Sequence, residues 1–150
     1  MLRSFLTVGS GYVAHMLCLY GAIAAIGYLA FPEFVEFMEL APEQQRQVME
    51  FDPSKAMPPA MFWSVVAVVT LASVVIGALA AWTAPFSPWA HSAFVAALLF
   101  VNYLQLATTD LPAKKSMTVI YMVAFPLAVV VGGRWMSRRS SPERPPPADV

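Results

Sequence analysis

The sequence predicts an all-α membrane protein whose four transmembrane helices form an up-down-up-down bundle. Hydrophobic residues make up 59% of the chain and charged residues 12%, whereas soluble domains carry roughly 25% charged residues. The stretch from Ala56 to Thr109 contains no Asp, Glu, Lys or Arg, and it is much longer than the about 20 apolar residues that one crossing needs. Because Pro85 and Pro88 interrupt helical geometry within it, this stretch is expected to form two antiparallel helices.

One domain is expected over residues 1–136, followed by a tail. Its helices are predicted at about residues 12–31, 59–82, 89–106 and 117–136. The segment 137–150 is rich in proline and arginine and lacks the apolar residues that a core requires, so we expect it to be disordered.

The segment 32–58 is the one long polar loop, and it joins the first helix to the second. Phe34, Phe37 and Met38 recur in it at helical spacing, which predicts short amphipathic helices at the membrane surface or the mouth of the bundle. Glutamates 33, 36, 39 and 43 would form an acidic stripe on the opposite side. A cation site there is an alternative to a solvated face, although hard cations need converging oxygens.

Basic residues indicate the orientation, and aromatic belts support the number of crossings. Four crossings place both termini on one side, which holds five basic residues (Arg3, Arg134, Arg138, Arg139 and Arg144) against four on the other (Arg46, Lys55, Lys114 and Lys115). Cytoplasmic residues next to membrane helices are enriched in Lys and Arg. We therefore expect cytoplasmic termini in a bacterial inner membrane. Interfacial aromatic residues are expected at one surface (Trp82, Trp89, Trp135) and at the other (Phe31, Trp63, Tyr103, Tyr121).

The second helix carries a small-residue face formed by Ser73, Gly77 and Ala81, which recur every four residues. Small residues allow the close backbone contact on which helix association in lipid depends. This face is predicted to pack on another helix of the same chain or of another protein.

The third helix places two amides on one face, Asn102 and Gln105. An amide in hydrocarbon needs a hydrogen-bond partner. We expect both side chains in a polar bundle interior or in the headgroup layer.

The two histidines of the chain, His15 and His91, are candidate haem ligands. They lie near the same ends of the first and third helices, and diagonal helices of a bundle can hold a haem between two imidazoles. The chain has a single cysteine, Cys18, and no cysteine-cluster metal site is expected.

No pattern in the sequence indicates an enzyme. There is no phosphate-binding glycine loop and no nucleophile triad at membrane depth, and the zero net charge does not favour nucleic-acid binding.

The layout resembles that of small uncharacterised four-helix membrane proteins of bacteria, from the first apolar crossing to the final one ending in Gly132, Gly133 and Arg134. The resemblance implies an integral membrane protein. We expect a structural or accessory subunit that associates with itself or with a larger membrane complex, without a cofactor. The alternatives are a transporter component for a neutral or lipidic solute, formed around Asn102, Gln105 and Pro126, and a haem- or quinone-linked redox subunit.

Overall fold

The computed structural model describes residues 2–84, 87–108 and 112–140. Every regular element in these ranges is an α-helix. The four long helices are α1 (Leu2–Ala30), α5 (Pro59–Thr83), α6 (Pro88–Ala107) and α7 (Pro112–Ser140). Each contains a segment long and apolar enough to cross a membrane, namely Arg3–Ala30, Pro59–Thr83, Pro88–Ala107 and Met117–Arg139.

The long helices differ from the predicted ones mainly at their ends. Helix α1 begins at Leu2 rather than near residue 12, because Gly11 lies against Val95 of α6 and Ile76 of α5 and packing holds this glycine-containing turn helical. Helix α7 starts at Pro112 and runs through Ser140. Residues 137–140 of the expected tail are therefore helical, and residues 141–150 lie outside the described part of the chain.

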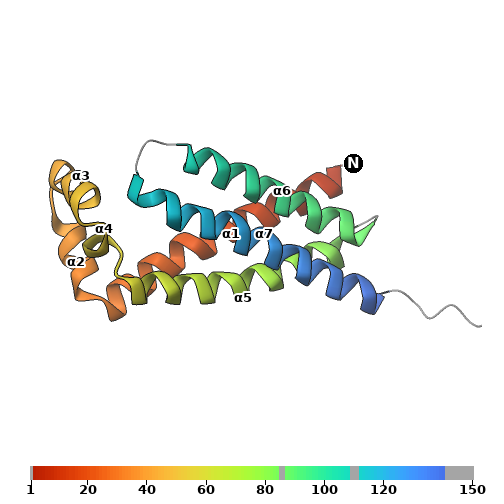
Figure 1. Cartoon of the computed structure of the whole chain (residues 1–150). Coiled ribbons are helices and arrows are strands. Elements are labelled where there is room, and N and C mark those ends of the chain that lie inside the picture. The colour runs from red at the N-terminus through yellow and green to blue at the C-terminus, as the bar shows by residue number, and fades with distance from the viewer. Residues whose placement is uncertain (1, 85–86, 109–111, 141–150) are drawn as a thin grey trace, which may run out of the picture.

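Three short helices connect α1 to α5. They are α2 (Pro32–Glu39), α3 (Pro42–Phe51) and α4 (Pro53–Ala56), and Figure 1 shows them together at the end of the bundle opposite the N-terminus. Phe34 of α2 anchors this group, since its ring lies directly on Gly27 of α1 and packs edge-to-face with Tyr28 at a centroid distance of 5.6 Å.

Prolines begin helices throughout this chain. Pro32, Pro42, Pro59 and Pro88 occupy first-turn positions of α2, α3, α5 and α6, where the missing amide hydrogen costs nothing. Of the proline-containing turn predicted between the second and third crossings, residues 85–86 lie outside the described ranges. Ser87 adopts a left-handed conformation, with φ 38°.

Helix α7 packs most extensively on α5 and α6, and α1 contacts α5 and α6 less extensively. Helices α5 and α7 approach each other closely at two glycines: a Cβ on Gly77 would overlap the carbonyl of Val129, and one on Gly132 would overlap the carbonyl of Val74. Gly133 faces the other neighbour, because a Cβ there would overlap the Ser92 side chain of α6. Consecutive glycines thus bring α7 close to both α5 and α6.

Candidate functional site

A buried polar cluster joins three helices in the middle of the bundle. His15 of α1 is fully buried, as is Ser73 of α5, and Tyr103 of α6 is 1% exposed. The His15 ring lies 2.9 Å from the Tyr103 hydroxyl through Nε2 and 3.1 Å from the Ser73 hydroxyl through Nδ1. We refer to His15, Ser73 and Tyr103 as the His15 cluster.

The hydrogen bonds of the His15 cluster determine which ring nitrogen of His15 carries the proton. The Ser73 hydroxyl donates its one hydrogen to the Val69 carbonyl oxygen at 2.6 Å, so its oxygen can only accept from Nδ1 of His15. A neutral imidazole then has an unprotonated Nε2, which accepts from the Tyr103 hydroxyl. Every polar atom of the cluster is satisfied, and the chain of hydrogen bonds ends on a backbone carbonyl.

Aromatic rings enclose the cluster. Phe125 of α7 lies 5.2 Å from the His15 ring and 5.9 Å from the Tyr103 ring, centroid to centroid. Tyr121 stacks on Phe125 at 5.0 Å and on Phe62 at 5.5 Å. The structure therefore buries Tyr103 between the helices, where its hydroxyl has a partner in His15.

A second polar pair links α1 to α6. The Tyr12 hydroxyl donates to the side-chain oxygen of Asn102 at 3.1 Å, so the amide has the intramolecular partner that its place in an apolar helix required. Gln105 differs: its side chain is exposed and so lies outside the interior of this bundle, which leaves the headgroup layer as the other place expected for it. The two residues are about 60° apart around the helix; Asn102 contacts Tyr12 of α1, and the Gln105 side chain is exposed.

His91 lies away from the His15 cluster. It is in the first turn of α6, with Nδ1 3.2 Å from the Ser87 carbonyl oxygen. Its buried Nε2 has no hydrogen-bond partner among the described residues. Tyr103, the partner of His15, follows His91 by 12 residues, a rise of roughly 18 Å along the helix axis.

Shared haem ligation by His15 and His91 does not fit this arrangement. Both ring nitrogens of His15 are already engaged. The helices expected to be diagonal, α1 and α6, are in direct contact through Gly11 and Val95, which leaves no space between them for a macrocycle. The residues described also contain no group of three or more His, Cys, Asp or Glu side chains that could hold a metal ion.

The small-residue face of the second crossing lies inside the bundle. Ser73 is fully buried, Ala81 is 2% exposed, and Gly77 contacts α7. The sequence did not show whether this face packs on the same chain or on another protein. In the structure Gly77 packs on α7 and Ser73 contacts the imidazole of His15 in α1, so both partners belong to the same chain.

Sequence reasoning missed Tyr12, Tyr103 and Phe125 as members of this site. The available signal was the i, i+3 spacing of Tyr12 and His15 on one helix, matched by the adjacent Asn102 and Tyr103 on another. No protein-family model, curated protein or solved structure matches the chain.

Proposed function

We propose that this chain is a small integral membrane protein that acts as a structural or accessory subunit by associating through its helices, with itself or with a larger membrane complex. In this proposal the four long helices cross a bacterial inner membrane up, down, up and down with cytoplasmic termini, and α2 and α3 lie at the opposite surface. The uneven basic flanks, with Arg134, Arg138 and Arg139 at the end of α7, support this orientation.

The observation that carries the proposal is the outward face of α1. Cys18, Gly21 and Ala25 are exposed, and their i, i+3, i+7 spacing puts them on one face of the helix. A Cβ on Gly21 would meet no atom within 4 Å. We call these three residues the α1 face. In lipid, such a face allows another helix to approach closely.

Helix α1 is also the long helix least enclosed by its own bundle. In the most apolar segment of each helix, 22% of the residues are buried in α1, whereas 39% are buried in α5. The small-residue face of α5 is used internally, whereas the α1 face is exposed, which supports association through α1.

The polar groups support association better than transport. Asn102 is bonded to Tyr12, and the His15 cluster is internally satisfied and enclosed by aromatic rings. These side chains stabilise the packing of the helices, and a solute path would need some of them to face an open cavity.

Fluorescence energy transfer between labelled copies of the full chain in lipid vesicles tests this proposal. Gly21→Leu should weaken self-association roughly tenfold, equivalent to about 1.4 kcal/mol, because the larger side chain prevents close approach. Gly9→Leu is the matched control, since Gly9 also has open space around its Cβ position but lies on another face of α1.

Three outcomes separate the possibilities. Loss of transfer in the Gly21 variant alone supports self-association through the α1 face. A monomeric wild type that is isolated in mild detergent with a stoichiometric partner, and loses it on Gly21→Leu, indicates the larger complex. Equal behaviour of both variants in both assays would overturn the proposal.

A further inference from the structure

Two adjacent hollows occur where the short helices meet the end of α1. The first, of about 290 Å³, is lined by Glu33, Glu36, Phe37, Leu40, Val48 and Lys55, and we call it the charged pocket. The second, of about 400 Å³, is lined by Tyr28, Leu29, Ala30, Phe31, Pro32, Val35 and Glu36, and we call it the apolar pocket. Glu36 lines both, so the two hollows share a wall.

The local fold fixes the shape of the charged pocket. The side-chain amide of Gln45 in α3 donates to the carbonyl oxygens of Phe37 and Leu40, at 3.3 and 3.1 Å. This caps the end of α2 and holds α3 against it. Phe37 is only 9% exposed, so the pocket has a firm apolar wall.

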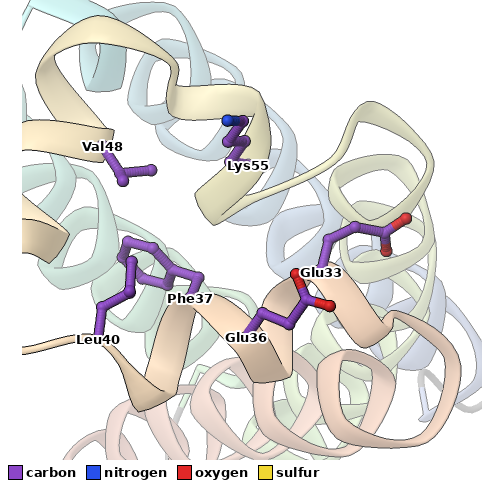
Figure 2. Close-up of a pocket in the computed structure, with 6 residues that line it drawn as sticks. All are labelled: Glu33, Glu36, Phe37, Leu40, Val48 and Lys55. Carbon is purple, nitrogen blue, oxygen red and sulfur yellow. The ribbon is translucent and has the colours of Figure 1, made fainter.

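Charges of both signs line the same pocket without neutralising one another. Figure 2 shows Glu33 and Glu36 on α2 and Lys55 on α4, with Phe37, Leu40 and Val48 together on the other side. Within the described residues, none of these three charged side chains forms a hydrogen bond or an ion pair. A ligand that carried both an ammonium and an anionic group would satisfy them together.

We propose that the two pockets bind one phospholipid whose head group carries a phosphate and a primary ammonium, as in phosphatidylethanolamine. The ammonium donates to Glu36 and Glu33, the phosphate accepts from Lys55, and an acyl chain lies in the apolar pocket beside Tyr28 and Val35. The charged pocket holds roughly ten water volumes, which suits a small head group.

The chemistry of the pocket distinguishes a primary ammonium from a quaternary one. Carboxylates accept hydrogen bonds, and a primary ammonium offers three donors. A quaternary ammonium offers none and is recognised by several aromatic faces, whereas Phe37 is the one aromatic residue that lines the charged pocket. Phosphatidylcholine should therefore bind more weakly than phosphatidylethanolamine.

The test uses the purified full chain, freed of lipid in detergent, and short-chain phosphatidylethanolamine or phosphatidylcholine with the same acyl groups. Native mass spectrometry measures the bound fraction. We expect the ethanolamine lipid to bind roughly tenfold more tightly, the effect of one charge-assisted hydrogen bond of about 1.5 kcal/mol. Equal binding of the two lipids would overturn the proposal.

Matched variants locate the site. Glu36→Gln should weaken binding of the ethanolamine lipid roughly tenfold, and Glu39→Gln, on the same helix but lining neither pocket, should not. In a second pair, Lys55→Gln should weaken binding of the lipid roughly tenfold, and Arg46→Gln, which does not line the pocket, should leave it unchanged. This pair provides the test if the Glu36 variant does not fold. Equal effects within either well-folded pair would contradict the assignment.

Free phosphoethanolamine separates a lipid from a soluble ligand. We expect it to bind more weakly than the lipid, because it leaves the apolar pocket empty. Binding as tight as that of the lipid would show that the ligand is a soluble head group and would refute the lipid assignment. This inference rests on the proposed membrane insertion, but it can fail while the Gly21 experiment succeeds, because one test measures bound lipid at Glu36 and Lys55 and the other measures contact between copies of the chain at Gly21.

Discussion

The α5–α7 contact and the α1–α6 contact hold helices together by different means. Helix α7 meets α5 backbone to backbone, with Gly77 against Val129 and Gly132 against Val74. Helix α1 meets α6 through polar side chains, with His15 bonded to Tyr103 and Tyr12 to Asn102. Lipid provides no hydrophobic force between helices, so close packing and hydrogen bonding are the two available sources of stability. Backbone contact distinguishes the α5–α7 pair, and buried hydrogen bonds distinguish the α1–α6 pair, which also packs at Gly11 and Val95.

The difference predicts unequal tolerance to substitution. A backbone contact cannot accept an added methyl group, because the carbonyl it would strike belongs to a rigid helix. A hydrogen-bonded contact can lose one bond and keep its packing.

Gly132→Ala should destabilise the bundle most, by about 3 kcal/mol, because its Cβ would overlap the Val74 carbonyl of α5. Reversible unfolding in mixed micelles measures the change. Gly9→Ala is the control, since no atom lies within 4 Å of its Cβ position and alanine favours the helix by about 1 kcal/mol. Similar losses in the two variants would show that α5 and α7 are not in backbone contact.

His15→Leu should cost about 2 kcal/mol of unfolding free energy, because it leaves the Tyr103 hydroxyl buried in an apolar environment. Reversible unfolding in mixed micelles measures this loss as well. A double-mutant cycle with Tyr103→Phe should give a coupling energy of about 1 kcal/mol, within the range seen for hydrogen bonds between membrane helices. A coupling energy of zero would mean that the two side chains do not interact.

Tyr12→Phe should have a smaller effect, about 0.6 kcal/mol, since it removes one hydrogen bond at a half-buried position. Asn102→Leu in the Tyr12→Phe background should then cost nothing further. An additional loss from the second substitution would reveal another partner of the Asn102 amide.

Gln105→Leu should change the unfolding free energy by less than about 0.5 kcal/mol, because its side chain is exposed. The comparison with Tyr12→Phe distinguishes the two amides, which sequence reasoning grouped together. A loss as large as that of Tyr12→Phe would place Gln105 in a polar contact.

Hydropathy and proline positions predicted the four apolar helices well, because an uncharged stretch longer than one crossing must turn back on itself. Helix ends were predicted less well, since Leu2–Gly11 and Ser137–Ser140 are helical through packing or continuation of a long helix. The site could not be assembled from sequence. The level at which His15 meets Tyr103 depends on how α1 and α6 slide along each other, and hydrophobic periodicity does not encode that register.

The most direct test of the proposed function is disulfide trapping at Cys18 in native membranes. The chain has this single cysteine, and it is exposed on the α1 face. We predict that a membrane-permeant oxidant produces a covalent dimer of the chain that disappears on reduction, is absent in Cys18→Ser and is reduced in Gly21→Leu. A chain that stays monomeric in the membrane fraction after oxidation, or that is found in the soluble fraction, would contradict self-association through α1.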